Sequence, residues 1–439
     1  MLFDPPRKLD IAERTVARIA ALPPIADRVR LFRNILVHPT QEMRDPDGAF
    51  FRGGPDWPRF RMQILVRHCW GAIPRPIDAR PLPARSEWPY FDPGFLPVFW
   101  PHLGIDPGLS PRDLEREALR LAASQAPLPD QIFDTVDAGI WAGPVSLHFG
   151  HMIADFGMRI AASSRIDPEM PLVFSLPPFR EPDPPAHFWQ IIDHLGIDRR
   201  RVLLIRTPTR FARLYVLPQA ERSFGGGPSR RHLAYLDAIT PSDRPPERDL
   251  DFVFVSRAGL PEGRFAAESY LDEMLTAAGV TVLHPETDDL RTQLQLYRRA
   301  RVLIFSEGSA VHALQLLGKV DAEIVVLVRR PGNQIAAASL RPRARSLRYL
   351  PATRALLHGL TPSGRPDTRA GLSVLDDERC LAALKAMGID LAPFWEPNAY
   401  AEQRDADLER WRTERQAALI HPRDRKLVGG QLQKLALAP

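Results

Sequence analysis

The chain has 439 residues, 44% of them apolar and 25% charged, which predicts a soluble globular protein of two domains and excludes a disordered chain. The net charge is 58 − 53 = +5 and is spread along the chain, so nucleic acid is the least favoured partner. The two distant cysteines, Cys69 and Cys380, exclude a disulfide framework and indicate a reducing compartment. No apolar window approaches the roughly 20 residues of a membrane span. We therefore expect a cytoplasmic protein and leave peripheral contact with the inner membrane open.

The first 130 residues carry few periodic patterns. A helical pattern runs from Leu9 to Leu36, and a second helix is predicted from Leu109 to Ala123, where Ser110 can cap it. Between them the chain is rich in proline and arginine, so we expect irregular structure with short strands such as Met62 to Arg67. No function follows from this region.

A histidine and an aspartate stand one helical turn apart in the segment from Gly143 to Ser164. The pattern becomes helical after Gly150, so His151 and Asp155 share one face of that helix. Either side chain could take a proton from an attacking hydroxyl, and the alternative is a packed histidine held by the aspartate. His148 lies in the preceding loop and is a weaker candidate; with His151 it could hold a metal, but no third ligand has suitable spacing.

Strands and helices then alternate as far as a proline-rich linker. The predicted strands are Pro171–Ser175, Arg201–Ile205 and Leu214–Leu217, and the predicted helices are Phe188–Leu195 and Arg230–Ile239. The segment from Pro241 to Arg248 contains three prolines and mixed charges, so we predict a domain boundary there.

The stretch from Asp251 to Gly332 has the clearest α/β pattern. Its predicted strands are Asp251–Val255, Val280–Leu283, Arg301–Phe305 and Glu323–Val328, and its predicted helices are Phe265–Ala278, Leu290–Ala300 and Ala310–Leu317. This alternation is typical of a parallel sheet, which binds ligands at the carboxyl ends of its strands. Ser256-Arg257 and Ser306-Glu307-Gly308-Ser309 occupy two such ends.

The second of these strand ends is predicted to bind a phosphate or pyrophosphate. Gly308 allows a ligand to approach the backbone, and Ser309 can cap the following helix or donate to an oxygen. Glu307 could accept hydrogen bonds from ribose hydroxyls, and His312 would face the ligand. Arg257 could pair with a diphosphate. The alternatives are an ordinary strand-to-helix turn and a solvated surface arginine. Neither a GxGxxG nor a Walker motif is present.

The chain beyond Pro331 has little regular pattern as far as Leu375. Helices are predicted from Asp377 to Met387 and from Tyr400 to Leu419. We expect this helical tail to pack back on the neighbouring domains.

Taken together, these motifs resemble glycosyltransferase family 61 over roughly Asp130 to Gly332. The resemblance rests on Gly150-His151 with Asp155, on the strand ending in Ser256-Arg257, on Pro285-Glu286, and on the segment Arg301 to Gly308. It implies two facing Rossmann-like domains, the GT-B architecture, and sugar transfer from a nucleotide donor with inversion and without an essential metal. It further implies that Ser256, Arg257, Gly308 and Ser309 line the donor diphosphate, with His151 and Asp155 on the acceptor side. Many members carry His-Gly-Ala-Gly where this chain has Glu307-Gly308-Ser309-Ala310, and glutamate is commoner at the position of Asp155.

The resulting expectation is an α/β protein of GT-B type with an acceptor-side domain at 1–240, a nucleotide-sugar-binding domain at 249–345 and a helical extension at 346–439. We expect an inverting, metal-independent glycosyltransferase of bacterial surface polysaccharide biosynthesis, with a saccharide or lipid-linked acceptor. It would need no cofactor beyond the nucleotide-sugar substrate. The alternatives are an inactive family member that acts as a scaffold, and a phosphosugar transferase on the same fold. The donor sugar, the nucleotide base and the oligomeric state stay open.

Overall fold

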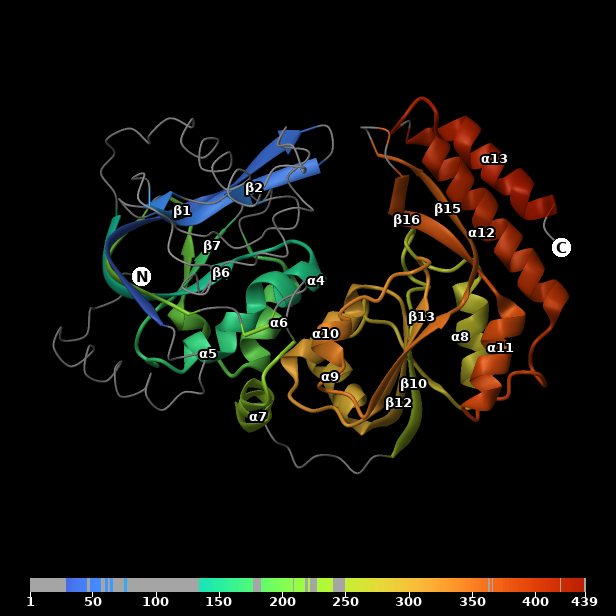
Figure 1. The fold of residues 1–439 in the computed structure, drawn as a ribbon, viewed down its shortest axis with the longest axis horizontal. Coiled ribbons are helices and arrows are strands. Elements are labelled where there is room, and N and C mark those ends of the chain that lie inside the picture. Colours follow the sequence, from blue (N-terminus) through green and yellow to red (C-terminus); the bar gives the residue numbers. More distant parts are fainter. Residues whose placement is uncertain are drawn as a thin grey trace. The chain divides into compact units, whose positions relative to one another are not determined.

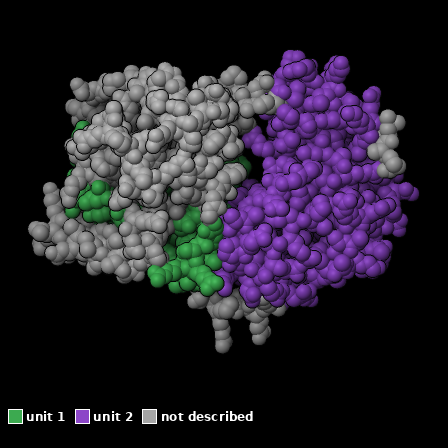
Figure 2. All heavy atoms as spheres, viewed as in Figure 1, with its two compact units in different colours: residues 1–241, 315–318 green, residues 242–314, 319–439 purple. Residues whose placement is uncertain are grey.

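The chain divides into two compact units (Figure 2). Unit 1 comprises residues 1–241 and 315–318, and unit 2 comprises residues 242–314 and 319–439. The computed structural model describes residues 29–45, 48–56, 60–61, 64–65, 75–76, 134–176, 183–207, 209–217, 220–221, 227–239, 249–361, 364, 366–418 and 420–437. The predicted helix Leu109–Ala123, the start of the helix predicted from Leu9, Cys69 and the predicted linker Pro241–Arg248 lie outside these residues.

Unit 1 contains a mixed sheet of seven strands (Figure 1). The strands are β1 (Arg30–Asp45), β2 (Gly48–Asp56), β4 (Ile64–Leu65), β6 (Asp134–Pro144), β7 (Leu172–Ser175), β8 (Val202–Ile205) and β9 (Thr209–Val216), in the order β4-β2-β1-β9-β6-β7-β8. Strands β9, β6, β7 and β8 run parallel, whereas β1 runs antiparallel to β9 and to β2. The strands β3 (Phe60–Arg61) and β5 (Arg75–Pro76) pair separately.

The helical segments of unit 1 follow the parallel strands. They are α4 (Phe149–His151), η4 (Met152–Phe156), η5 (Gly157–Arg159), α5 (Ile160–Ser164), α6 (Ala186–His194), η6 (Arg199–Arg201) and α7 (Arg230–Ile239). The predicted strands near β7 and β8 and the predicted helices near α6 and α7 are confirmed. The helical prediction is wrong for residues 30–36, because this segment pairs with β9 over most of its length. Strand β6 was not predicted.

Unit 2 contains an entirely parallel sheet of five strands. These are β10 (Leu250–Val255), β11 (Thr281–Leu283), β12 (Ala300–Ser306), β13 (Glu323–Val328) and β14 (Ser346–Pro351), in the order β11-β10-β12-β13-β14. Strands β12 and β13 are buried almost throughout and are rich in Val, Ile and Leu, the composition expected where helices cover both faces of a sheet. The first four strands confirm the sequence prediction.

Helices cover both faces of the unit 2 sheet (Figure 1). On one face lie α8 (Glu268–Ala277) and α11 (Asp377–Ala386), and on the other lie α9 (Leu290–Arg299) and α10 (Ala337–Leu340). A continuous apolar core joins Phe254 of β10 to Leu271 of α8 and Leu384 of α11. The segment after β12 is a 3-10 helix, η7 (Ser309–Leu316), where an α-helix over Ala310–Leu317 was predicted.

The segment predicted as a purely helical extension begins with strands. Strand β14 belongs to the central sheet, and β15 (Thr353–Leu360) forms an antiparallel pair with β16 (Pro366–Leu375). The helices α12 (Pro397–Ala417) and α13 (Asp424–Leu437) follow α11 and pack on this pair through Leu408, Trp411 and Val428. The expected start of the extension at residue 346 is therefore corrected, because β14 takes its hydrogen bonds from β13. Within the described ranges, no helix combines the length and apolarity needed to cross a bilayer.

Candidate active site

The carboxyl ends of β10 and β12 form the topological switch point of the unit 2 sheet. The chain leaves β10 to build β11 on one side, and returns to build β12 on the other side. Open parallel sheets bind their ligands at such a point, because the loops diverge there and leave room beyond the strand ends. Ser256-Arg257 directly follows β10, and Glu307-Gly308-Ser309 directly follows β12. The tertiary structure thus brings the two segments to one edge of the sheet.

The guanidinium of Arg257 is held at this edge by a backbone carbonyl, whereas an acid binds only its backbone N–H. Its Nε donates to the Gly263 carbonyl at 2.6 Å, and its backbone N–H donates to Glu268 Oε1 at 2.9 Å. A Cβ on Gly308 would lie 2.0 Å from Arg257 Nη1, so the guanidinium rests on the glycine backbone. Burial lowers the pKa of Arg257, opposed by the charge of Glu268. Across the described residues, no carboxylate lies within ion-pair distance of its guanidinium.

Arg329 is a second cation at the same edge and, unlike the half-buried Arg257, it is buried; the sequence interpretation missed it. It follows β13 directly, and only 3% of the residue is exposed. Its terminal nitrogens donate to the carbonyls of Thr368, Arg369 and Gly371 at 3.2–3.4 Å, and its buried Nε has no partner. Burial, followed by the charge of Arg330, lowers the pKa of Arg329 to about 10. The sequence feature that could have identified Arg329 as a site residue is its position directly after the strand predicted to end at Val328.

Gly263 lies between the two arginines. A Cβ there would lie 3.1 Å from Arg257 Nη2 and 3.8 Å from Arg329 Nη2, and the φ of Gly263 is +71°, in the region that favours glycine. The charge of Arg257 contributes to the lowered pKa of Arg329. Arginine keeps its charge at neutral pH, so two guanidinium groups that form no ion pair among the described residues favour an anion at this edge, although the charges of Glu268 and Glu307 partly offset theirs.

Glu307 holds the loop after β13 in place. Its side chain is fully buried, and its Oε2 accepts the backbone N–H groups of Arg329 and Arg330, both at 2.8 Å. Its Oε1 accepts Arg330 Nε at 2.6 Å and the Asn333 amide at 2.5 Å. The ribose contact predicted for this carboxylate is therefore not available in this arrangement, because every bond direction serves the loop after β13.

Three further residues were predicted to contact the ligand at this edge, namely Ser309, His312 and Ser256. Ser309 and His312 lie in η7 and are half-buried. The Oγ of Ser256 donates to Asp272 Oδ2 at 2.8 Å and accepts the Ala258 N–H at 3.0 Å. Ser256 thus stabilises the loop that carries Arg257, and its 1% exposure leaves little surface for a ligand.

His151 and Asp155 form a hydrogen-bonded pair in unit 1. His151 Nδ1 lies 2.5 Å from Asp155 Oδ2, and the side chains are 28% and 1% exposed, respectively. The buried carboxylate contacts the imidazole at Nδ1, which fixes the orientation of the ring and leaves proton exchange to the other ring nitrogen, Nε2. The predicted one-turn spacing therefore brings these two side chains together.

A π-helical turn carries Asp155 inside the helical segment 149–164. This turn is η4, and Met152, Ile153 and Phe156 within it are fully buried. A Cβ on Gly157 would lie 2.8 Å from the Met152 carbonyl oxygen, so the glycine admits the wider turn. Single π turns of this kind occur often at functional sites because they redirect one side chain.

Two further histidines surround the pair. The His148 and His151 rings lie 4.4 Å apart, and His148 Nδ1 accepts the His151 N–H at 3.3 Å. His187 Nε2 lies 3.0 Å from the Ser146 carbonyl, and burial lowers the pKa of His187. His148 and His151 follow the carboxyl end of β6, and His187 packs on the loop after it. This position is again the end of a strand that runs parallel to its neighbours.

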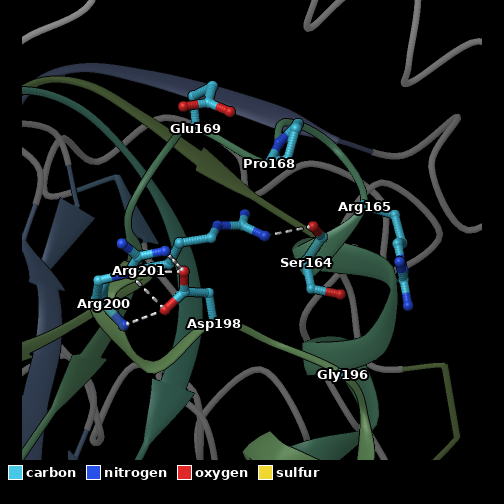
Figure 3. A pocket seen from close by; sticks show the side chains of 8 residues that line it. All are labelled: Ser164, Arg165, Pro168, Glu169, Gly196, Asp198, Arg200 and Arg201. Atoms are coloured by element: carbon cyan, nitrogen blue, oxygen red, sulfur yellow. Dashed lines mark hydrogen bonds and ion pairs between the residues drawn. The ribbon is translucent and has the colours of Figure 1, made fainter.

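A pocket of about 720 Å³ lies at the other end of the unit 1 sheet (Figure 3). It is lined by Ser164, Arg165, Pro168, Glu169, Gly196, Asp198, Arg200 and Arg201, which precede β7 and β8. Arg200 pairs with Asp198, and Arg201 donates to the Ser164 carbonyl at 2.9 Å. Its charged groups therefore serve the local loops, and it is separate from the His151–Asp155 pair.

The sequence was compared with known families and proteins. Residues 149–319 match the family model described as glycosyltransferase 61, and no curated protein matches the chain. The matched segment includes His151 and Asp155 as well as Arg257 and Gly308. Over this segment the chain is therefore similar to glycosyltransferase family 61.

Proposed function

We propose that the protein is an inverting glycosyltransferase that binds a nucleotide-sugar donor on unit 2 and uses a base on unit 1 to activate the acceptor hydroxyl. The family match supports sugar transfer in general. The division of work between the units is the one the GT-B architecture implies, and the acceptor would be a saccharide or a lipid-linked saccharide of bacterial surface polysaccharide biosynthesis.

The observation that carries this proposal is a pair of arginines at the switch point of the unit 2 sheet, the half-buried Arg257 and the buried Arg329, whose guanidinium groups form no ion pair with a carboxylate among the described residues. A diphosphate would supply the missing anion, and guanidinium groups match its oxygens in charge and geometry. Gly308 has no side chain, which lets the Arg257 guanidinium lie against the start of η7, where a phosphate could meet both the guanidinium and backbone N–H groups.

The reaction would be a direct displacement at the anomeric carbon. The acceptor oxygen forms a bond to that carbon, while the bond from the carbon to the diphosphate oxygen breaks and its electron pair leaves with the diphosphate. Attack from the opposite face inverts the configuration. Arg257 and Arg329 would stabilise the charge on the leaving diphosphate, a role for which other transferases use a metal ion. We therefore propose that no metal is essential.

The acceptor proton would pass to His151 rather than to Asp155. The carboxylate is buried and already bonded to Nδ1, whereas the imidazole is the more accessible of the two side chains. A proton taken by Nε2 produces an imidazolium, and Asp155 stabilises it from the other side of the ring. Asp155 would thus be a positioning residue.

The test is release of nucleoside diphosphate from candidate donors in the presence of candidate acceptors. Arg257→Ala should lower kcat by roughly 100-fold or more, because an electrostatic contact to the leaving group is lost. Arg425→Ala, an exposed arginine of α13, is the matched control and should turn over normally. An active enzyme whose turnover does not change in Arg257→Ala would refute the role given to Arg257.

A further inference from the structure

We infer that Glu286 is the acceptor for the ribose hydroxyls of the bound nucleotide, a task that the sequence analysis gave to Glu307. This inference rests on the proposed function, since it assigns a further part of the donor to the same edge of unit 2. The ligand class is a nucleoside diphosphate with both hydroxyls of its ribose present.

The position of Glu286 follows from the order of the strands. Strand β11 pairs with β10 on the side away from β12, and Glu286 stands three residues beyond its carboxyl end. A Cβ on Gly259 would lie 2.1 Å from Glu286 Oε1, so the backbone two residues beyond Arg257 runs directly against this carboxylate. The charge of Glu286 also acts on Arg257.

The oxygens of Glu286 are available, unlike those of the neighbouring acids. Its side chain is only 25% exposed, yet no donor among the described residues makes a hydrogen bond to it. His284 Nδ1 lies 3.7 Å from Glu286 Oε1, which is beyond hydrogen-bond distance. By contrast, Glu268 accepts the N–H groups of Arg257 and Phe265, and Glu307 is saturated.

His284 connects this carboxylate to the loop that carries Arg257. Its Nε2 lies 3.7 Å from Asp272 Oδ2, and that same oxygen accepts the Ser256 hydroxyl. Glu286, His284, Asp272 and Ser256 therefore run in series from the end of β11 to the end of β10.

The spacing of the groups along the edge suits a nucleotide. With the diphosphate on Arg257 and Gly308, the ribose is the next group, and β11 is the next strand on the Gly259 side. Open α/β folds that bind nucleotides commonly place an acid at the end of the second strand, where its two oxygens accept the ribose hydroxyls. Here β11 holds that place relative to β10 and β12.

The experiment compares ligands by calorimetric titration of the full-length protein. The ligands are UDP, GDP, their 2′-deoxy and 3′-deoxy forms, and inorganic pyrophosphate. In the wild type, loss of either hydroxyl should weaken binding of the preferred nucleotide about tenfold. Glu286→Gln should bind that nucleotide about tenfold less tightly, lose most of the discrimination against the deoxy forms, and bind pyrophosphate as well as or better than the wild type. Glu402→Gln, an exposed acid of α12, is the matched control.

The outcomes separate this inference from the proposed function. If the protein binds pyrophosphate and nucleotide but Glu286→Gln keeps the full discrimination against deoxy forms, the ribose assignment is overturned and the donor site stands. If the wild type binds pyrophosphate but does not distinguish ribose from deoxyribose, the assignment is likewise overturned. If neither pyrophosphate nor any nucleotide binds the wild type, the proposed function fails and the ribose assignment fails with it.

Discussion

Asp272 shows how one buried carboxyl group couples pH to the loop that carries Arg257. It lies on α8, accepts the Ser256 hydroxyl through Oδ2, and has no partner for its buried Oδ1. Burial raises the pKa of Asp272 from 3.8 to about 8, with a further contribution from the charges of Glu268 and Glu286. Near neutral pH this acid is therefore mostly protonated in the folded protein.

The stability of unit 2 should consequently fall as the pH rises from about 4 to 8. The folded state holds the Asp272 proton more tightly than the unfolded state, so the stabilisation is complete below the unfolded pKa of 3.8 and is lost as the pH passes about 8. One proton corresponds to a slope of at most about 1.4 kcal/mol per pH unit. Urea unfolding across this range should show that slope in the wild type and its loss in Asp272→Asn. Asp251→Asn, an exposed acid of β10, should keep it; an unchanged slope in Asp272→Asn would contradict the argument.

The two terminal helices are held to the β15–β16 pair by Arg415, a buried cation that pairs with Asp424 of α13 and with Asp367 of β16. Arg415 of α12 donates from Nε to Asp424 Oδ2 at 3.0 Å and from Nη2 to the Leu360 carbonyl at 2.6 Å. Asp424, at the start of α13, also accepts the Leu360 N–H at 2.7 Å. Each ionic side chain is 5% exposed. The helices α12 and α13 and the strands β15 and β16 thus meet at Arg415.

Removal of the Asp424 charge should be costly, because it leaves the buried Arg415 with Asp367 alone, whose Oδ2 lies 3.6 Å from Arg415 Nη1. We expect Asp424→Asn to lower the free energy of unfolding by roughly 3–5 kcal/mol. The exposed pair Glu409–Arg412 on α12 offers the comparison, and Glu409→Gln should change the free energy by less than about 1 kcal/mol. Chemical denaturation of the three proteins gives both values, and equal effects of the two substitutions would show that burial does not set the cost.

Ligand binding by the complete protein separates an active transferase from a family member that has become a scaffold. A nucleotide at 100 times its dissociation constant should stabilise the folded protein by about 2.7 kcal/mol. Hydrogen exchange should slow most at residues 256–263 and 306–312 of unit 2, because the anion is expected to contact those loops. An inactive scaffold that has lost the donor site would show neither effect with UDP or GDP, although both of its units would be folded.

The helices and strands of residues 251–328 were predictable because their signals are local. Strand β13 has the predicted bounds, Glu323–Val328, since a short run of β-branched residues in a charged surrounding is readable without its partners. The same holds for α7 and for the strand ends that carry Arg257 and Gly308. The His151–Asp155 pair was also predictable, because a spacing of four residues on a helix is enough to bring two side chains together.

Residues 30–36 and 346–375 were assigned wrongly or left without structure because their strands depend on distant partners. Strand β14 alternates in burial and finds its hydrogen bonds only on β13, and β1 finds its own on β2 and β9. The sequence pattern does not show which strands pair in space, so residue type alone did not predict these strands.

The assignment of individual acids and arginines to tasks came only from the folded chain. Glu307, Glu268 and Glu286 are the same residue type near the same edge, yet the first two each accept two backbone N–H groups, whereas no described residue donates a hydrogen bond to the third. Arg329 and Arg330 are adjacent in sequence, yet only Arg330 meets a carboxylate. Side-chain chemistry and strand endings follow from the order of residues, whereas burial and the neighbours in space determine which charge is paired and which is left to bind a ligand.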